Sequence, residues 1–363
     1  MARTQLKDVC EVSWGDTTVT KASYVAVGYP AFSASGCDGF LPYFDHEGPG
    51  IVLSAIGAQC GKTWFTQGKW SCIKNTIYIK SKSSEADARY IFYTLSDPDV
   101  WPKRGAAQPF ISQTDARNVE VPLPPLPVQQ RIAGILSAYD ELIENSQRRI
   151  KILESMARAL YREWFVHFRF PGHEHHPRVT SPLGEIPQGW KVKMLGSIAD
   201  ISWGDTSTTK ASYVEDGYAA YSASGMDGRL DHFDYDRVGI VLSAIGAQCG
   251  KTWLARGQWS CIKNTIRFWA SSDTVSTEFL FIATEGQDFW PRRGAAQPFI
   301  SQGDAQRKEI LIPDDLTMKN FSAFVADALK QVSVLESQIQ NLRRARDLLL
   351  PRLLSGQIEV EAA

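Results

Sequence analysis

The sequence lacks the features of a membrane or secreted protein. No apolar run reaches the roughly 18 residues that a membrane span needs. The opening Met1-Ala2-Arg3-Thr4-Gln5 begins no signal-peptide apolar segment. We therefore expect a cytoplasmic protein with no membrane partner. The formal net charge is only −1, from 39 Lys and Arg against 40 Asp and Glu, which excludes a uniformly basic coat but not local basic faces.

Metal-binding patterns are also scarce. The six cysteines include no CxxC pair, so we predict no zinc site and interpret the cysteines as buried, reduced thiols. The cluster His173-Glu174-His175-His176 lies in a segment flanked by Pro and Gly and has no counterpart elsewhere in the chain. We therefore expect neither a bound metal nor any other cofactor in this chain.

What the sequence does contain is a long repeat. Residues 13–113 align with residues 202–302 without a gap, at a constant offset of 202 − 13 = 189, and about 60 of about 100 positions are identical. Segments 54–64 and 105–113 recur letter for letter. A repeat of this length is a whole domain. Two near-equal domains in one chain can imitate a homodimer, and duplex DNA is the commonest partner with two-fold symmetry.

Each copy has a β-rich part followed by a helical part. Residues 50–56 and 73–79 are predicted as buried strands, among frequent Gly and Pro breaks. After the proline run 122–127, apolar or small residues alternate at spacings of four and three, which predicts a coiled-coil helix over residues 128–167, about 60 Å long. The positions are Ile132, Leu136, Tyr139, Ile143, Ser146, Ile150, Leu153, Ala157, Leu160 and Trp164.

The second copy keeps this frame, with Arg346 as the one charged departure and Pro351 limiting the regular end. Its positions are Phe321, Val325, Ala328, Val332, Leu335, Ile339, Leu342, Arg346, Leu349 and Leu353. Each seam needs a partner, and an antiparallel helix pair would place the β-rich domains at opposite ends about a pseudo-two-fold axis. The predicted fold is α+β. The predicted division is β-rich domain 1–126, helix 127–170, linker 171–184, β-rich domain 185–314 and helix 315–358.

Segment 57–63, Gly-Ala-Gln-Cys-Gly-Lys-Thr, imitates a phosphate-binding P-loop but has three residues between its glycines instead of four. The aromatic, Gly-broken sequence that follows does not predict a helix, so a nucleotide-binding enzyme is disfavoured. A Gly-flanked turn also lets backbone approach DNA, where Gln59 and Lys62, with Gln248 and Lys251 in the second copy, could bond bases or phosphates. The alternative is a structural turn repeated by descent.

Further polar segments recur in both copies, and each is weighed against a plain surface loop. The DNA-contact candidates in the first copy are Lys21, Ser23, Tyr24, Ser33, Ser35, Lys74, Asn75, Lys103, Arg104 and Gln108. Those in the second are Lys210, Ser212, Tyr213, Ser222, Ser224, Arg229, Lys263, Asn264, Arg292, Arg293 and Gln297. The recurring tryptophans 14, 64, 70 and 101 are interpreted as core rather than base-stacking residues.

The chain resembles the specificity subunits of type I restriction–modification systems over essentially its whole length. The resemblance rests on the domain–helix–domain–helix order, on residues 185–190, Glu-Ile-Pro-Gln-Gly-Trp, and on the exit into the first helix, residues 108–112 and 121–132. The family usually has Glu at position 128, where this chain has Val, and the second copy keeps only Ile312-Pro313 of the proline run.

The resemblance implies a non-catalytic subunit that reads a split DNA target, one half per domain. It implies two adenine methyltransferase (M) subunits as partners, and restriction (R) subunits, separate or fused, with S-adenosylmethionine, ATP and Mg on those partners. Because the two copies share their polar loops, we expect an interrupted palindrome, with a spacer of about 5–8 bp between half-sites read about one helical turn apart. A coiled-coil adaptor whose end domains bind protein is the alternative of another class.

Overall fold

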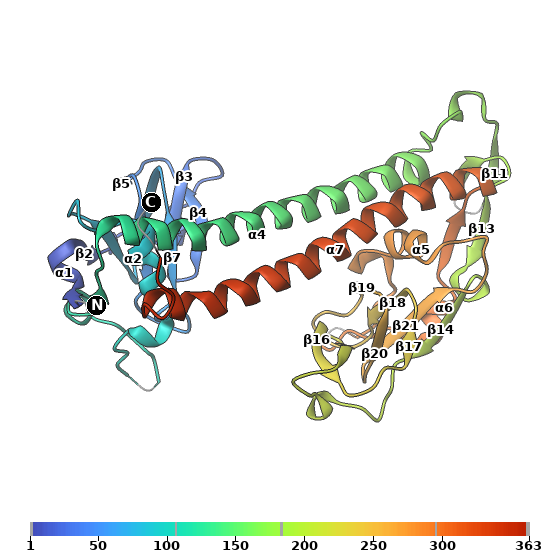
Figure 1. The fold of residues 1–363 in the computed structure, drawn as a ribbon. Helices are drawn as coiled ribbons and strands as arrows, with labels where there is room; N and C mark the ends of the chain where they lie inside the picture. The colour runs from blue at the N-terminus through green and yellow to red at the C-terminus, as the bar shows by residue number, and fades with distance from the viewer. Residues whose placement is uncertain (1–2, 106, 182–183, 295, 361–363) are drawn as a thin grey trace. The chain divides into compact units, whose positions relative to one another are not determined.

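The computed structural model describes residues 3–105, 107–181, 184–294 and 296–360 (Figure 1). The chain divides into two compact units. Unit 1 comprises Met1–Ser146 and Ser337–Ala363, and unit 2 comprises Gln147–Glu336. Each unit holds one β-rich domain, here called domain 1 and domain 2, and one half of each long helix, α4 (Leu126–Tyr161) and α7 (Asp315–Leu354).

Domain 1 is built from two four-stranded sheets. The first has the order β2-β9-β6-β7 with antiparallel neighbours, and the second has the order β4-β3-β8-β5 with β3 and β8 parallel. The elements are β1 (Arg3–Gln5), α1 (Leu6–Val9), β2 (Cys10–Trp14), β3 (Tyr29–Ser33), β4 (Gly36–Leu41), β5 (His46–Glu47), β6 (Gly50–Ser54), β7 (Thr63–Thr66), β8 (Lys69–Cys72), β9 (Thr76–Ser81), α2 (Ala88–Thr94), α3 (Gln113–Arg117) and β10 (Glu120–Pro122), which pairs with β1.

Domain 2 repeats this topology strand for strand, with sheets β14-β21-β18-β19 and β16-β15-β20-β17. A hairpin of β11 (Arg178–Ser181) and β12 (Gly184–Pro187) precedes it. The elements are β13 (Lys191–Met194), β14 (Ala199–Trp203), β15 (Tyr218–Ser222), β16 (Gly225–Leu230), β17 (Tyr235–Asp236), β18 (Gly239–Ser243), β19 (Thr252–Ala255), β20 (Gln258–Cys261), β21 (Thr265–Ala270), α5 (Thr277–Ala283), α6 (Gln302–Gln306) and β22 (Glu309–Ile312).

The predicted strand over residues 50–56 is confirmed as β6, but the strand predicted over residues 73–79 was wrong at its start. The chain turns at Lys74 and Asn75 and the strand begins only at Thr76. Asn75 has a φ of +70°, a left-handed conformation that the short polar side chain of Asn tolerates and that no strand residue adopts. Thr76 closes the turn by donating from Oγ1 to the Ile73 carbonyl at 2.5 Å.

The predicted helix seam is confirmed by burial. All twenty seam positions are buried or half-buried, and Phe321 and Val325, near the start of α7, have no exposed surface. The first helix extends through a π-helical turn, Arg162–Val166, close to the predicted end at residue 167. The second continues past Pro351 to Leu354, so the proline lies within its last turn.

The long helices pair antiparallel in both units. In unit 1 the start of α4 meets the end of α7, because Ile132 and Leu136 share a core cluster with Leu353. In unit 2 the end of α4 meets the start of α7, where the ring centroids of Trp164 and Phe321 lie 6.0 Å apart. The predicted α+β class, with two β-rich domains and an antiparallel helical pair, is therefore confirmed. In the described part of the chain, no helix has the length and apolar content of a membrane span.

Candidate nucleic-acid interface

Four direct hydrogen bonds bring the predicted polar segments of domain 1 together. The turn at residues 74–75 bonds to the loop after β2 and to the end of β6, since Lys74 N–H donates to the Val19 carbonyl at 3.4 Å and Ala55 N–H donates to the Asn75 carbonyl at 3.0 Å. The end of β6 in turn holds the loop between β3 and β4, through Ser54 Oγ and the Ala34 carbonyl at 3.0 Å.

The fourth bond adds the loop around residues 103–110. Gly57 N–H donates to the Pro109 carbonyl at 3.0 Å, next to a bridge between Ile56 and Phe110. Five segments spread over residues 16–110 are thus linked by hydrogen bonds into one group of loops, here called the loop face of domain 1. Its residues are 16–24, 33–38, 54–62, 74–75 and 103–110.

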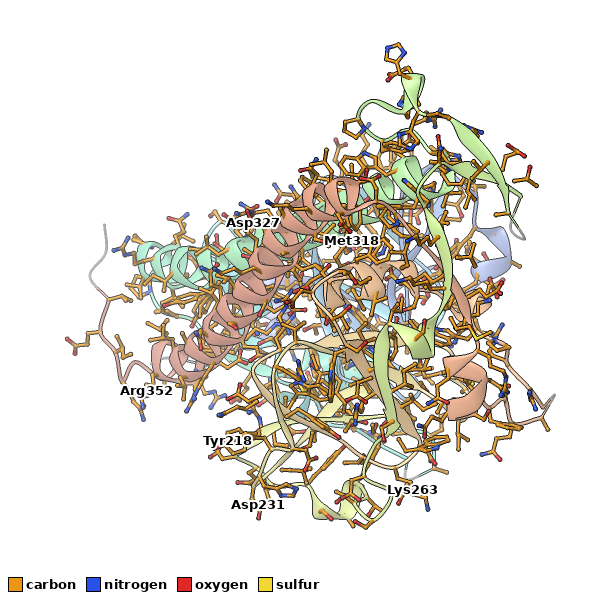
Figure 2. The ribbon with its side chains drawn as sticks, turned by 90° about the vertical axis from the view of Figure 1, so that its right-hand side faces the viewer. Tyr218, Asp231, Lys263, Met318, Asp327 and Arg352 are labelled. Atoms are coloured by element: carbon orange, nitrogen blue, oxygen red, sulfur yellow. The ribbon has the colours of Figure 1, made fainter. Side chains whose placement is uncertain are left out.

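The equivalent loops of domain 2, residues 205–213, 222–227, 243–251, 263–264 and 292–299, form its loop face, but the bond from Ser54 has no counterpart there, because Ser243 Oγ has no hydrogen-bond partner among the described residues. The Lys263 N–H bonds the Thr208 carbonyl at 3.4 Å, and the Gly246 N–H bonds the Pro298 carbonyl at 3.0 Å. Figure 2 shows Lys263 on the side of the domain that faces away from Met318 and Asp327 of α7. Ala106 and Ala295, in the small-residue turns of the two faces, lie outside the described residues.

A single carboxylate organises the first two segments of domain 1. Asp38 accepts hydrogen bonds from the Tyr24 hydroxyl at 2.8 Å and from Ser33 Oγ at 2.7 Å, and it forms an ion pair with Lys21. Ser33 Oγ also accepts the N–H of Ser35 at 3.0 Å. Four predicted candidates therefore surround an aspartate that the sequence prediction did not include.

Domain 2 repeats this arrangement around Asp227. The Tyr213 hydroxyl and Ser222 Oγ each donate to its carboxylate at 2.7 Å, and Lys210 forms the ion pair. We call each arrangement the Asp38 centre or the Asp227 centre. Ser23 and Ser212 are exposed in the short 3₁₀ turns Lys21–Ser23 and Lys210–Ser212 beside them, and Ser224 donates its N–H to Ser222.

The protonation states within these centres are well defined. Burial by itself raises the pKa of Asp38, but the bonds from Lys21, Ser33 and Tyr24 outweigh it, so the pKa lies below its ordinary value. Burial and the bond to Asp38 raise the pKa of Tyr24, so the phenol stays a hydrogen-bond donor. The pKa values of Asp227 and Tyr213 shift in the same directions for the same causes.

Glycine fixes the close packing at the Asp38 centre. A Cβ at Gly39 would lie 1.9 Å from Cδ2 of Tyr24, so only glycine lets the ring lie flat against β4. The equivalent distance from Gly228 to Tyr213 is 2.0 Å. The tyrosine is held from two sides, by its hydroxyl and by its ring.

The loop after β6 is a tight turn and not a nucleotide cradle. Cys60 N–H donates to the Gly57 carbonyl at 2.9 Å and Lys62 N–H donates to the Gln59 carbonyl at 3.0 Å. Gly57 has a φ of +104° with open space around its Cβ position, so a partner could approach its backbone. Lys62 is exposed and Gln59 half-buried, whereas Gln248 and Lys251 are both exposed.

The predicted cations after residue 102 each have a carboxylate partner. Arg104 bonds Asp115 at 2.6 Å and Arg293 bonds Asp304 at 2.5 Å, and both arginines keep about 60% of their side chains exposed. Lys103 and Arg292 make looser pairs with Asp99 and Asp288, at 3.4 and 3.3 Å. Exposed Gln108 and Gln297 lie in the same loops.

Asp115 itself is held in the first turn of α3. Ser112 Oγ donates to its carboxylate at 2.6 Å, and this bond and the one from Arg104 lower the pKa of Asp115. The arginine is thus held at the surface by a charged partner that is itself held by α3.

Two of the differences between the copies lie on the edge strands β4 and β16, beside the shared loops. Phe40 is 42% exposed, and its counterpart Arg229 donates from Nη1 to the Gly217 carbonyl at 2.8 Å. Cys37 and its counterpart Met226 are exposed beside Asp38 and Asp227. Val19 is buried, whereas Thr208 bonds Asp205.

The interpretation of the tryptophans as core residues is confirmed for Trp70, Trp101, Trp259 and Trp290, which are at most 3% exposed. Among the described residues, no group of three His, Cys, Asp or Glu side chains could hold a metal. In the histidine cluster, His173 Nδ1 lies 2.8 Å from the Phe170 carbonyl and His176 Nε2 lies 2.7 Å from the Gln188 carbonyl, so both contact backbone.

Comparison with known proteins agrees with the resemblance. Residues 1–155 match the family model described as type I restriction modification DNA specificity domain. The MjaIX specificity subunit of Methanocaldococcus jannaschii is 24% identical over 279 residues, which cover 71% of this chain and 65% of that protein. The MjaVIII specificity subunit of the same organism is 30% identical over 158 residues, 42% of this chain and 36% of that protein. The chain is thus similar to type I restriction–modification specificity subunits, and its residues 1–155 match their DNA specificity domain.

A solved specificity subunit also has this fold. The S subunit of a type I restriction–modification system from M. genitalium has a TM-score of 0.68 to this chain, covers 97% of it over 95% of its own length, and is 16% identical. The curated specificity subunits are matched over 65% and 36% of their own lengths, so this chain spans only part of each.

Proposed function

We propose that this chain is the DNA-reading subunit of a type I restriction–modification enzyme and that each loop face reads one half of a split target. The observation that supports the proposal is the gathering of all five predicted polar segments into one face, in both domains. The face presents Lys and Arg for phosphates and guanine, and Gln and Asn for adenine, which are the side chains that read the major groove.

The parts of the face have different tasks under this proposal. Exposed cations such as Lys62 and Lys74 neutralise phosphates and set the salt dependence of binding. Gln59 and Gln108 are the candidates for base edges, because a side-chain amide can make paired bonds to adenine. Arg104 is held by Asp115 while most of its side chain stays exposed, so its remaining N–H groups are available to bond DNA.

The helices and boundaries of the chain belong to the same proposal. Target domains at residues 1–126 and 185–314, helices at 127–170 and 315–358 and a linker at 171–184 provide two readers on one helical scaffold. Two adenine methyltransferase subunits and the restriction subunits assemble on this scaffold and carry S-adenosylmethionine, ATP and Mg. The chain itself supplies no catalytic group.

The test uses the complex with its methyltransferase partner. The variant Gln59→Ala/Lys62→Ala/Arg104→Ala removes three members of the first loop face. A base-reading member contributes about 1–3 kcal/mol and a phosphate-binding member reduces the salt slope. We expect loss of discrimination at one half-site only, measured by methylome sequencing and by binding at several salt concentrations.

A matched control carries the same residue types away from the loop face of the same domain. Gln67 and Lys69 flank the turn after β7, at the opposite end of that strand from Lys62, and Arg89 begins α2. Gln67→Ala/Lys69→Ala/Arg89→Ala is expected to leave the methylated motif unchanged. If the loop-face variant and the control variant methylate the same motif and bind DNA with the same affinity, the assignment of the DNA-reading site is wrong. A complex with no sequence preference at all would instead favour the adaptor function, and methylation by this chain without a partner would contradict its non-catalytic role.

A further inference from the structure

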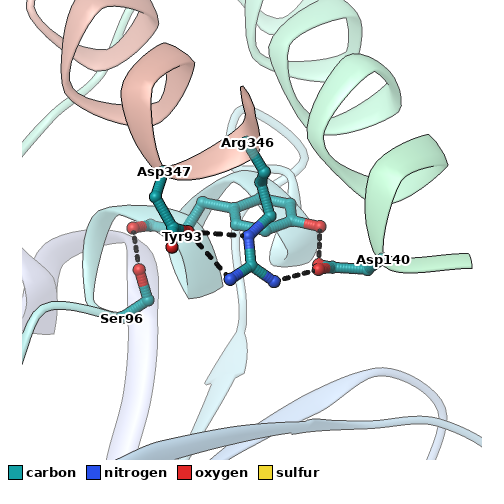
Figure 3. Close-up of polar contacts among 5 residues, drawn as sticks. All are labelled: Tyr93, Ser96, Asp140, Arg346 and Asp347. Carbon is teal, nitrogen blue, oxygen red and sulfur yellow. Dashed lines mark hydrogen bonds and ion pairs between the residues drawn. The ribbon is translucent and has the colours of Figure 1, made fainter. Parts of the chain in front are cut away.

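The one charged residue on the seam of α7 lies in a polar network within unit 1. Arg346 donates from Nη1 to Asp140 of α4 at 2.5 Å, and the other oxygen of Asp140 accepts the Tyr93 hydroxyl of α2 at 2.6 Å (Figure 3). Asp347 also accepts from Arg346, at 2.8 Å. About 30% of the Arg346 and Asp140 side chains is exposed. The network joins α2, α4 and α7.

The second copy has no such network at the equivalent places. The offset of 189 relates Tyr93 to Ile282, Asp140 to Leu329 and Arg346 to Ala157 (93 + 189 = 282, 140 + 189 = 329, 346 − 189 = 157). These three residues are at most 6% exposed and belong to the core of unit 2. The same three positions are thus polar and mutually bonded in one unit and wholly apolar in the other.

The apolar side chains of the seam do not determine whether the C-terminal part of α7 or that of α4 packs in unit 1. Beside Arg346, unit 1 has a hollow of about 760 Å³, bordered by Leu350 and Leu354. Their counterparts in α4 are the larger Tyr161 and Phe165, since 350 − 189 = 161 and 354 − 189 = 165. The hollow leaves room for the larger side chains, so packing alone would let α4 take the place of α7 in a second copy of the chain.

The charged residues do distinguish the α4–α7 pair from an α4–α4 or an α7–α7 pair. If α4 paired with α4 of a second copy, Asp140 would face Ala157 and lose its cation. If α7 paired with α7, Arg346 would face Leu329 and Ile282. Removing one partner of a partly buried pair is costly, because the remaining charge loses both its partner and its water.

A second ion pair adds to this discrimination within unit 2. Arg158 of α4 binds Glu285 through two bonds, at 2.7 and 2.8 Å. Their equivalents in unit 1 are Asp347 and Ser96 (158 + 189 = 347, 285 − 189 = 96). In an α7–α7 pair Asp347 would therefore face Glu285, a like-charge contact, and in an α4–α4 pair Arg158 would face Ser96.

We propose that the Tyr93–Asp140–Arg346 network and the Arg158–Glu285 pair commit α4 to α7 and reject the pairing of either helix with the same helix of a second copy. The repeat makes such like-with-like pairing the main competing structure, because both helices share one seam. The proposal rests on contacts within each unit and does not depend on DNA reading.

The test uses the full chain and two variants. Tyr93→Ile/Asp140→Leu/Arg346→Ala places the residues of the second copy in the first. Asp140→Arg/Arg346→Asp reverses the ion pair, which keeps α4–α7 pairing but still leaves an unpaired charge in any like-with-like pair. We expect the wild type and the reversed variant to sediment as monomers of 40.4 kDa. The apolar variant is expected to form concentration-dependent dimers.

A cysteine reports which helices meet. In an α4–α4 pair residue 140 would face residue 157, so the centre of the pair falls between residues 148 and 149, because 140 + 157 = 297. In chains that also carry Cys37→Met, which removes the exposed native thiol, an added Ile150→Cys is expected to give a disulfide-linked dimer in the apolar variant but not in the wild type. An apolar variant that stays monomeric, or a wild type or reversed variant that cross-links equally, overturns the proposal.

Thermal unfolding gives a measurement that does not require dimers. Asp140→Leu alone and Arg346→Ala alone each leave one charge without its partner, and we expect each to lower the midpoint by roughly 3–6 °C. The apolar triple variant is expected to recover most of that loss. Losses that simply add in the triple variant would overturn the proposal.

Discussion

Asp38 accepts a 2.8 Å hydrogen bond from the hydroxyl of Tyr24, whose ring lies flat against Gly39. The relationship recurs as Asp227 with Tyr213, at 2.7 Å. In each case the same carboxylate also holds a lysine and a serine. In each domain, one aspartate carboxylate therefore sets the orientation of three side chains that we propose to face DNA.

The first prediction follows from this position. Asp38→Asn keeps the shape but removes the ion pair with Lys21, so the loop loses its fixed orientation. We expect discrimination between target and unrelated DNA to decrease about 5- to 30-fold, since hydrogen bonds to a charged group contribute on the order of 1–2 kcal/mol at a partly exposed site. Binding to unrelated DNA is not expected to weaken, because a negative charge is removed.

Competition binding by the complex with its methyltransferase measures both quantities. Asp227→Asn is expected to have the same effect at the other half-site. Asp8→Asn, on the exposed face of α1, is the control and is expected to behave as wild type. If Asp38→Asn discriminates as well as the control, the Asp38 centre is not a positioning device.

The second prediction concerns pH. His46 packs between Trp70 and Tyr78, with ring centroids 4.4 and 4.3 Å apart, and burial followed by the charge of Lys80 lowers its pKa below 6.5. The unfolded chain therefore binds this proton more readily than the folded one. The contribution of His46 to the free energy of unfolding is therefore fully present above about pH 6.5, and it is lost as the pH falls towards the lowered pKa.

The second copy supplies the matched variant. Tyr235 occupies the equivalent position and packs on Trp259 at 4.6 Å. We expect His46→Tyr to fold with the same packing and to reduce the loss of the unfolding midpoint between pH 7 and pH 5. An unchanged pH profile would show that other groups cause the loss.

The sequence predicted the fold well because two periodic signals are strong. The constant offset of 189 gives the domains, and the alternation of four and three gives both helices. The turn at Asn75 was missed because apolar residues on both sides imitate one strand. The Asn75 carbonyl accepts a tertiary bond from the Ala55 N–H, which no local pattern reveals.

The central residue of the candidate site was missed for a related reason. A lone Asp on an edge strand has the appearance of ordinary surface, and its partners Lys21 and Ser33 lie 17 and 5 residues away. One signal was available. Asp38-Gly39 recurs as Asp227-Gly228 although both flanking residues differ between the copies, Cys37 against Met226 and Phe40 against Arg229. Identity of the pair between two differing neighbours indicates a constraint on it.

The third prediction uses the helices as a ruler. Inserting seven residues after Ser146 and seven after Leu335 keeps the heptad seam in frame and lengthens each helix by about 10 Å. Since a base pair rises about 3.4 Å, we expect the preferred spacer to lengthen by about three base pairs, from an initial length of about 5–8. Methylome sequencing gives the spacer directly. A folded, active variant that keeps the original spacer would show that the helices do not set it.

The last prediction concerns the symmetry of the target. The two loop faces share the Asp38 and Asp227 centres, the turn after β6 and the arginine loop, so we expect both to read the same or nearly the same half-site. In each unit the helices run antiparallel, which favours readers presented to DNA in opposite directions. The methylated motif is therefore expected to be an interrupted palindrome, each half the reverse complement of the other.

The edge strands identify where the palindrome can fail. Phe40 and Arg229 are the most different pair beside the shared loops, and only arginine can bond guanine. Its bond to the Gly217 carbonyl uses one guanidinium nitrogen and leaves the others available. We expect Arg229→Phe to make the two halves of the methylated motif more alike by changing the half that domain 2 reads. We expect Phe40→Arg to make them more alike by changing the half that domain 1 reads. Halves unrelated by inversion in the wild-type motif would show instead that the shared loops are scaffold and that β4 and β16 carry the reading.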